Sequence, residues 1–353
     1  MTIVIVGLSI TSSWGNGHAT TYRALVRALA SRGHDVLFLE RDAEWYAANR
    51  DLPNPEYCRT AIYPSLTALK NDWRHEVERA DAVMVGSYVP DGRKVIDWTF
   101  ECSRGLRLFY DIDTPITLMY LENDTCEFLR RDQIEAFDLY LSFAGGEALR
   151  KLEQQYQAKA ARPLYCSVDT DRYRPLPVEK RWHLGYLGTY SGDRQPALDV
   201  RLVEPARRWT VGRFVVAGPQ FPEELTWPGN VDRITHLAPP LHPTFYCAQQ
   251  FTLNVTRAAM VAAGHSPSVR LFEAAACGTP IITDAWTGLD EFFEPGTEIL
   301  VTHSADETLM YLRDLPAGER MALAERARAR VLASHTADHR ALELERYLEE
   351  VCN

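Results

Sequence analysis

Arg270 and Glu273 are the residues best placed to do chemistry, because both are charged and stand in an otherwise apolar segment. Ser266 and Pro267 predict a helix start just before them, with a capping hydroxyl and a proline at the first helical position. Gly278 predicts where the helix ends. At 100° per residue Arg270 and Glu273 share one face of this helix, and the other faces are apolar enough to be buried.

The predicted helix, residues 267–277, could hold a nucleoside diphosphate. Its first N–H groups and positive dipole would bind the phosphates, Arg270 would add a bidentate donor, and Glu273 could accept both ribose hydroxyls. An Arg–Glu pair three residues apart that neutralises itself explains the same two charges. Both explanations stay open on helix physics alone.

A glycine loop near the start of the chain, formed by Gly15, Asn16, Gly17 and His18, offers a second place for chemistry. Glycine backbone can approach a ligand closely there, and His18 can face it as a base. A first-turn histidine bonded to the backbone is the alternative. The loop lacks the G-x-G-x-x-G spacing of a dinucleotide site, although Glu40 stands near the position that would bind ribose.

Alternating strands and helices must position these residues. Apolar strands are predicted at 3–7, 36–39, 82–85, 106–110 and 139–143, and again at 183–187, 214–217, 231–237, 252–255, 280–283 and 299–301. Such alternation predicts parallel sheets with helices on both faces, and therefore an α/β fold. A polar, proline-containing stretch separates the two series.

The predicted organisation has four parts. An N-terminal Rossmann-like domain covers 1–165, a linker 166–182, and a second Rossmann-like domain 183–335. The last segment, 336–353, is a helix that could pack back on the first domain.

Two segments resemble glycosyltransferases of the GT-B fold. EAAACGTPIITDAWTGLDEFFEPGTEILV, residues 273–301, is similar to the donor-binding segment of family 4 and of CgeB-like (spore maturation type) glycosyltransferases. VDTDRYRP, residues 168–175, is similar to the interdomain segment of family 4. The resemblance implies two Rossmann-like domains facing across a cleft, with a nucleotide sugar held by the second and an acceptor held mainly by the first.

The sequence departs from the family 4 pattern in two respects. That pattern has two glutamates separated by seven residues; here the second is Glu273, but His265 stands in the first position. Those enzymes also commonly pair an arginine with a lysine on the diphosphate, yet Lys180 is the last lysine of the chain. Arg194, and more weakly Arg257, are therefore expected beside Arg270.

The resulting site assignments fall into three groups. Catalytic roles are expected for His18, Arg270 and Arg194; donor binding for Glu273, Ser266, Ser268, His265, Gly188, Arg257 and His236; and acceptor contacts for Gly15, Gly17 and Asp113. His236 follows a predicted strand and could lie near the base, although a satisfied core histidine is the favoured interpretation. Asp111 and Asp113 resemble the metal-binding DxD motif of GT-A enzymes, and a strand-ending turn explains them equally.

The predicted function is metal-independent transfer of a sugar from a nucleotide-diphosphate sugar, with UDP-sugars and retention of configuration favoured. No cofactor is expected beyond the donor, and the lack of lysine after residue 180 excludes a pyridoxal-phosphate site in the second domain. An NAD(P)-dependent oxidoreductase that uses Glu40 and a non-catalytic nucleotide-sugar-binding protein are the alternatives.

Charge and cysteine content limit the partners. The formal net charge is −10, from 38 basic and 48 acidic residues, which argues against nucleic acid as a partner. Seven cysteines without a CxxC pair suit reduced thiols and a cytoplasmic protein. No apolar run is long enough for a transmembrane helix and no signal peptide is expected.

Overall fold

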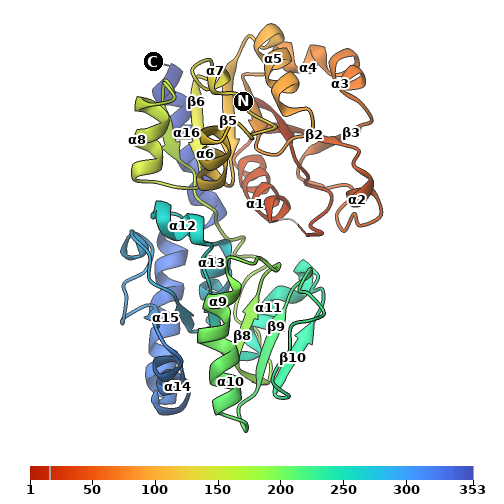
Figure 1. Cartoon of the computed structure of the whole chain (residues 1–353). Helices are drawn as coiled ribbons and strands as arrows, with labels where there is room; N and C mark the ends of the chain where they lie inside the picture. Colours follow the sequence, from red (N-terminus) through yellow and green to blue (C-terminus); the bar gives the residue numbers. More distant parts are fainter. Residues whose placement is uncertain (16, 353) are drawn as a thin grey trace. The chain divides into compact units, whose positions relative to one another are not determined.

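The computed structural model describes residues 1–15 and 17–352. The chain forms two compact units, one of Met1–Cys166 with the helix that starts at Ala337, the other of Ser167–Thr336. A sheet of parallel strands lies at the centre of each unit (Figure 1). The predicted α/β class with two Rossmann-like sheets is confirmed.

In the first unit, the described residues form a seven-stranded sheet in the order β3-β2-β1-β4-β5-β6-β7. Its strands are β1 (Thr2–Gly7), β2 (Asp35–Arg41), β3 (Arg59–Tyr63), β4 (Ala82–Gly86), β5 (Leu106–Asp111), β6 (Leu139–Ser142) and β7 (Ala161–Pro163). Its helices are α1 (His18–Ser31), α2 (Glu44–Ala47), α3 (Leu66–Asp72), α4 (Arg74–Arg79), α5 (Gly92–Cys102), α6 (Thr114–Glu122), α7 (Arg131–Ile134), α8 (Glu147–Gln154) and α16 (Ala337–Cys352). Asn353, with which the predicted last helix ended, lies outside the described residues.

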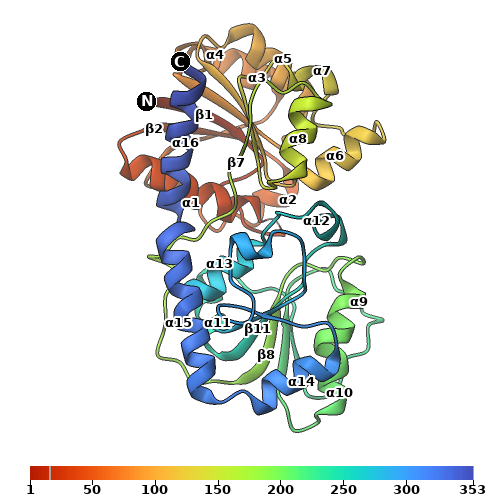
Figure 2. The same cartoon turned by 90° about the vertical axis from the view of Figure 1, so that its left-hand side faces the viewer.

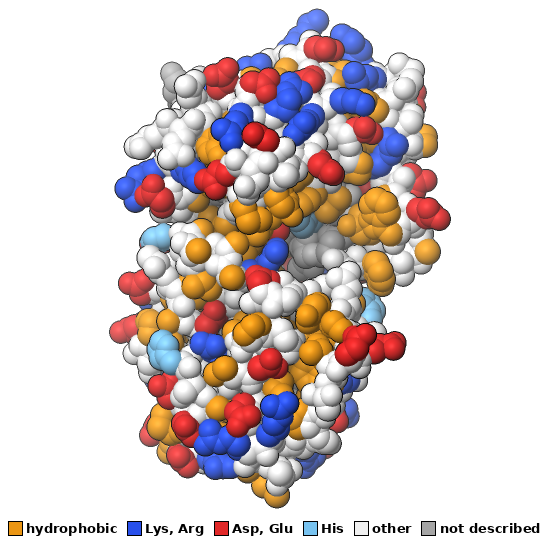
Figure 3. Space-filling model, in the orientation of Figure 1, with side chains coloured by type: hydrophobic (Ala, Val, Ile, Leu, Met, Phe, Trp, Pro, Cys, Tyr) orange, Lys and Arg blue, Asp and Glu red, His pale blue; other side chains and the backbone are white. Residues whose placement is uncertain are grey.

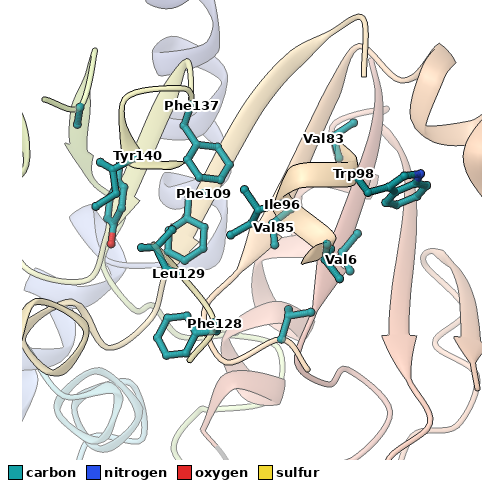
Figure 4. Packing of buried hydrophobic residues seen from close by; sticks show 14 of the residues in the cluster. Val6, Val83, Val85, Ile96, Trp98, Phe109, Phe128, Leu129, Phe137 and Tyr140 are labelled. Atoms are coloured by element: carbon teal, nitrogen blue, oxygen red, sulfur yellow. The ribbon is translucent and has the colours of Figure 1, made fainter. Parts of the chain in front are cut away.

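The two faces of this sheet bury different helices, because side chains alternate along each strand. Ile3 and Ile5 of β1 pack into a cluster with α1 and α16. Val4 and Val6 point to the opposite face, where α3, α4, α5 and α8 contribute to the cluster shown in Figure 4. Helix α16 lies along α1 (Figure 2), so the last helix of the chain completes the core of the first unit.

Strands β3 and β7 were absent from the prediction. Only Tyr63 of β3 is buried, so the strand lacks the apolar alternation that reveals a half-buried strand. β7 has three residues and includes Pro163. Both strands lie at the edges of the sheet, where burial imposes the weakest pattern on the sequence.

In the second unit, the described part of the chain forms a six-stranded sheet in the order β10-β9-β8-β11-β12-β13. Its strands are β8 (Trp182–Leu187), β9 (Phe214–Ala217), β10 (Val231–Ile234), β11 (Gln249–Asn254), β12 (Ile281–Thr283) and β13 (Leu300–Val301). Its α-helices are α9 (Gln195–Leu198), α10 (Glu204–Arg208), α11 (His242–Cys247), α12 (Ala258–Ala263), α13 (Val269–Ala276), α14 (Ala305–Asp314) and α15 (Ala317–Ser334). A π-helical segment, Asp199–Val203, joins α9 to α10.

One face of the molecule carries charges of both signs (Figure 3). Basic and acidic side chains are interspersed on the face shown in Figure 3. Among the described residues, no helix is both long and apolar enough to cross a membrane.

Candidate active site

The sheet of the second unit has a point at which its strand order reverses. The chain moves from β8 to β9 and β10 on one side, and then returns to β11, β12 and β13 on the other. The reversal therefore lies between β8 and β11. In open parallel sheets, ligands bind outside the carboxyl ends of the strands at such a point.

Arg270, on the first turn of α13, reaches this reversal point. Its Nε donates a hydrogen bond to the carbonyl oxygen of Leu187, the last residue of β8. Its Nη1 donates to Oδ1 of Asn254, the last residue of β11, at 2.6 Å. One buried guanidinium therefore spans the carboxyl ends of the two strands between which the order reverses.

The surroundings of Arg270 leave one edge of the guanidinium open. Its Cζ lies 4.9 Å from the ring centroid of Tyr186, and its Nη2 makes no hydrogen bond with any described residue. A Cβ on Gly188 would lie 2.8 Å from this Nη2 and 2.7 Å from Oη of Tyr186. Gly188 thus lets the guanidinium lie against the backbone.

A buried polar network holds Asn254 in place behind Arg270. Nδ2 of Asn254 donates to Oγ1 of Thr283 at 2.9 Å and to Oγ1 of Thr256 at 3.2 Å. The carboxylate of Asp284 accepts hydrogen bonds from the backbone N and the Oγ1 of Thr256. The sequence analysis missed this network, whose only sequence signal is a polar residue at the end of each of two apolar strands.

Arg194 lies beside Arg270 at the start of α9. Its Nη2 donates to the carbonyl oxygen of Thr189 at 2.8 Å, whereas its Nε is buried and has no hydrogen-bond partner in the described chain. Burial lowers the pKa of Arg194, and the positive charges of Arg270 and Arg257 lower it further. These three guanidinium groups are called the arginine cluster below.

Two members of the arginine cluster, Arg194 and Arg270, carry positive charge that no ion pair with a described residue neutralises. Asp193 Oδ2 lies 3.9 Å from Nε of Arg257, and it also accepts a hydrogen bond from the backbone N of Ala258. Arg194 and Arg270 form no ion pair with a described carboxylate. Positive charge gathered in this way, with buried donors left unpaired, is suited to an anion such as a diphosphate.

Helix α13 begins at Val269, two residues later than predicted. Ser268 occupies the N-cap position, and no side chain of the described residues caps the helix, so the predicted capping role of Ser266 is wrong. His265 has a φ of 46°, and its backbone N donates to the carbonyl oxygen of Thr287 at 2.6 Å. The chain before Ser268 is therefore bound to a neighbouring loop and does not continue the helix.

His265 contacts that loop through its side chain as well. Its Nδ1 lies 2.8 Å from Oε1 of Glu291. A Cβ on Gly288, whose φ is 87°, would come within 2.4 Å of the imidazole, so only glycine permits this packing. The residue at the first glutamate position of the family 4 pattern is thus engaged with a carboxylate of its own chain.

Glu273 lies one turn after Arg270 and is 4% exposed. Its Oε2 accepts a hydrogen bond from Oη of Tyr246, on α11, at 2.8 Å. Although both residues are described, Arg270 and Glu273 form no ion pair with each other. The alternative of a self-neutralising Arg–Glu pair is therefore wrong.

His236 is exposed in the segment that follows β10. The strand ends at Ile234, three residues earlier than predicted, so His236 lies beyond the sheet. The favoured interpretation of His236 as a core histidine is wrong.

In the first unit, His18 is the first residue of α1. Its Nδ1 is buried and has no hydrogen-bond partner among the described residues, which contradicts the alternative of a side chain bonded to the backbone. Burial lowers the pKa of His18 to about 4, so the imidazole is neutral at pH 7. Gly15, whose φ is 66°, and Gly17, the N-cap residue, precede His18 in the sequence. A Cβ on either glycine would have no neighbouring atom within 4 Å. Asn16 of the same loop lies outside the described residues.

Asp111 and Asp113 do not act as a pair. The carboxylate of Asp111 is fully buried and accepts hydrogen bonds from Tyr140 at 2.6 Å and Thr117 at 2.8 Å. Burial raises its pKa to about 6. Asp113 is half-buried and accepts a hydrogen bond from Tyr88 Oη at 3.3 Å. A DxD metal site does not fit this arrangement, and the described residues contain no group of three or more His, Cys, Asp or Glu suited to a metal ion.

The carboxylate of Glu40 is hydrogen-bonded to the loop that follows β1. Its carboxylate accepts hydrogen bonds from the backbone N of Ile10 and from the backbone N and Oγ1 of Thr11, all within 2.9 Å, and it is fully buried. The predicted possibility that Glu40 binds a ribose is therefore wrong.

Comparisons with known proteins find a family match for part of the chain and similar folds for nearly all of it. Residues 194–346 match a family model described as glycosyl transferase-like. No curated protein matches the sequence. Sucrose-phosphate synthase from Thermosynechococcus elongatus is similar in structure, with a TM-score of 0.72 and 16% identity over 99% of this chain and 98% of that one.

Two further solved structures are similar over nearly their whole length. Anabaena HepE in complex with UDP and glucose has a TM-score of 0.72 and 13% identity, covering 99% of this chain and 100% of its own. An α-glucosyltransferase in complex with UDP-glucose and DNA has a TM-score of 0.73 and 11% identity, covering 99% of each chain. At these identities the likeness shows the fold, which is that of GT-B glycosyltransferases.

Proposed function

We propose that this protein is a glycosyltransferase that moves a sugar from a nucleotide-diphosphate sugar, with UDP-sugars favoured, to a hydroxyl acceptor. The observation that carries the proposal is the arginine cluster at the reversal point of the second sheet. Two of its guanidinium groups keep unpaired N–H donors there, Nη2 of Arg270 and Nε of Arg194. The match of residues 194–346 to a glycosyl transferase-like model supports the same function.

The arginine cluster would act mainly on the leaving group. As the bond between the anomeric carbon and the diphosphate oxygen breaks, its electron pair leaves on the diphosphate, and the sugar becomes oxocarbenium-like. Arg270, Arg194 and the uncapped start of α13 provide fixed donors for the negative charge that develops, and such preorganised donors are commonly the largest catalytic contribution. No divalent ion is needed in this scheme.

The fate of the acceptor proton depends on the stereochemical course. We favour retention, in which an oxygen of the departing diphosphate takes the proton while the acceptor oxygen bonds to the anomeric carbon. Inversion would require a base, and His18 is the candidate because its imidazole is neutral at pH 7. The anomeric configuration of the first product, read by proton NMR, distinguishes the two courses.

The first unit argues against the oxidoreductase alternative. Its reversal point lies between β1 and β4, where a dinucleotide would bind. A Cβ on Gly86, the last residue of β4, would come within 1.9 Å of Oη of Tyr22 from α1, so this hydroxyl already fills the space at the strand end. Glu40, the ribose candidate, is also fully used by its own loop.

The ligands of the similar structures suggest the donor. Complexes of HepE contain UDP or UDP-glucose, and complexes of the α-glucosyltransferase contain UDP or UDP-glucose and, in some cases, DNA. We propose a UDP-sugar for this chain as well. Nucleic acid is not the acceptor we propose, because a net charge of −10 opposes contact with phosphate backbones.

Calorimetric titration of the full chain with UDP, ADP, GDP and NADH tests the proposal, followed by an assay of UDP-glucose hydrolysis. We expect binding of UDP and slow release of UDP from UDP-glucose. Binding of NADH without UDP would overturn the proposal in favour of an oxidoreductase. Binding of UDP without hydrolysis of any UDP-sugar or transfer from it would identify a non-catalytic binding protein.

A further inference from the structure

Three side chains that bear hydrogen-bonding groups follow three neighbouring strands of the first unit. His18 comes after β1 and the glycine loop, Tyr88 comes after β4, and Asp113 comes after β5. These strands are adjacent in the sheet, in the order β1-β4-β5, and they run parallel. Their carboxyl ends therefore bring the three residues to one edge of the sheet, beside its reversal point.

Tyr88 connects the other two. Its ring meets the imidazole of His18 edge-on, with centroids 5.6 Å apart and an angle of 77° between the planes. Its hydroxyl donates a hydrogen bond to Oδ2 of Asp113 at 3.3 Å. Phe128 lies against the same ring, with centroids 4.6 Å apart, so the tyrosine is held between neighbours.

The backbone of the β4–α5 loop is strained where it presents Tyr88. Tyr88 has a φ of 61° and Asp91 a φ of 56°, in the left-handed region that residues with a Cβ disfavour. Strain of this kind persists where surrounding contacts enforce it, and it is concentrated at functional sites. Tyr88 has such contacts, with His18, Phe128 and Asp113.

We propose that Tyr88 is a positioning residue of an acceptor site that takes a neutral, polyhydroxylated compound. The ring fixes the imidazole of His18, and the hydroxyl orients the carboxylate of Asp113 so that it can accept hydrogen bonds from acceptor hydroxyls. The inference rests on the proposed glycosyltransferase function.

Charge selects the acceptor class. Asp113 contributes a carboxylate, and neither Tyr88 nor the imidazole of His18 contributes a positive charge at pH 7. Hydroxyl groups on an acceptor can donate to the carboxylate of Asp113. A phosphate or carboxylate on the acceptor would instead be repelled by Asp113, so a neutral sugar or polyol is the better ligand.

Tyr88→Phe tests the positioning role because it removes only the hydroxyl. Tyr63→Phe is the matched control: this tyrosine is buried at the end of β3, and its hydroxyl has no hydrogen-bond partner among the described residues. The probes are transfer from UDP-glucose to glucose, which uses the proposed acceptor site, and UDP alone for donor affinity. We expect Tyr88→Phe to lower kcat about 10-fold with an unchanged Kd for UDP, and Tyr63→Phe to leave both unchanged.

The outcomes separate this inference from the proposed function. An unchanged kcat in Tyr88→Phe, or an equal fall in Tyr63→Phe, overturns the positioning role while the donor function stands. Failure of the wild type to bind UDP overturns the proposed function itself.

The acceptor class has its own test, in which glucose and glucose 6-phosphate compete for sugar from UDP-glucose. Transfer that favours glucose over glucose 6-phosphate supports a neutral acceptor. Transfer that favours glucose 6-phosphate overturns it. If the wild type binds UDP but glycosylates neither sugar, the ring nitrogens of His18 are followed by NMR with each sugar added to the UDP-bound protein. A response to glucose alone supports the neutral class, and a response to glucose 6-phosphate alone, or to neither, overturns it.

Discussion

Arg194 is the residue whose substitution best separates ligand binding from folding. Arg270 has two strong internal acceptors and packs on Tyr186, so its removal would leave Oδ1 of Asn254 unpaired in the core. Arg194 has a single hydrogen bond, to the carbonyl oxygen of Thr189. Removal of the Arg194 side chain should therefore cost the fold little.

Arg194→Ala is expected to weaken UDP binding by about 1.5–3 kcal/mol, the contribution of a hydrogen bond to a charged group, which is roughly 10- to 100-fold in Kd. The melting temperature should change little. Calorimetry and thermal unfolding of one preparation measure both quantities. Arg207→Ala, at an exposed position on α10, makes the same charge change and should keep the wild-type Kd. Equal losses of affinity in the two variants would assign the effect to net charge.

His18 gives a pH-dependent prediction. Its pKa is about 4 in the folded protein, against an ordinary value of 6.5, because it is buried. Between these two pH values the unfolded chain binds a proton that the folded chain does not, so this contribution to stability is lost as the pH falls. The loss is at most about 3 kcal/mol between pH 6.5 and pH 4, at about 1.4 kcal/mol per pKa unit.

Urea unfolding of the wild type and of His18→Gln from pH 4 to pH 7 measures this effect. As the pH falls, the free energy of unfolding of the wild type should decrease more than that of His18→Gln. His75→Gln, at an exposed position on α4, should follow the wild type. If the free energies of unfolding of the wild type and His18→Gln depend on pH in the same way, burial does not lower the pKa of His18.

At the scale of elements, α11 and α13 meet through the hydrogen bond between Tyr246 and Glu273. The bond is compatible with two roles for Glu273, because a carboxylate can accept from tyrosine and from ribose at the same time. Substitution of each of the two residues in turn separates these roles. Tyr246→Phe removes the internal donor and keeps the carboxylate, whereas Glu273→Gln removes the charge.

We expect Glu273→Gln to weaken UDP binding by about 1.5–3 kcal/mol and Tyr246→Phe to change it little. The wild type should bind 2′,3′-dideoxy-UDP more weakly than UDP by a similar amount. Glu273→Gln should barely distinguish the two nucleotides, because the contact to the ribose hydroxyls is already lost. Full discrimination in Glu273→Gln would remove Glu273 from the ribose site and leave it a structural residue.

At the scale of the whole molecule, the charge distribution predicts metal-independent activity. The arginine cluster concentrates positive charge at the reversal point of the second sheet, in a chain whose net charge is −10. A diphosphate that leaves against these groups needs no divalent ion for neutralisation. Turnover of UDP-glucose should therefore persist in EDTA. Complete loss with chelator, restored by Mn²⁺ or Mg²⁺, would contradict this mechanism.

Part of this architecture follows from local sequence patterns. Strands β1 and β4 were predictable because each is a short, nearly continuous apolar run, as expected for strands buried on both faces. Edge strands β3 and β7 were not, because burial leaves no such pattern there. The start of α13 was misplaced because the contact of His265 with Thr287 overrides the local capping signal of Ser266.

The sequence by itself determined the α/β class, the two Rossmann-like sheets, and the charged pair on an apolar helix, because these depend on periodicity and composition over short windows. The tertiary structure decided which of the polar side chains come into contact, and with what. Arg270 bonds to a carbonyl 83 residues away in sequence, and Tyr88 to a carboxylate 25 residues away. No local pattern encodes such contacts, because strand order in the sheet, and not distance along the chain, brings strand ends together.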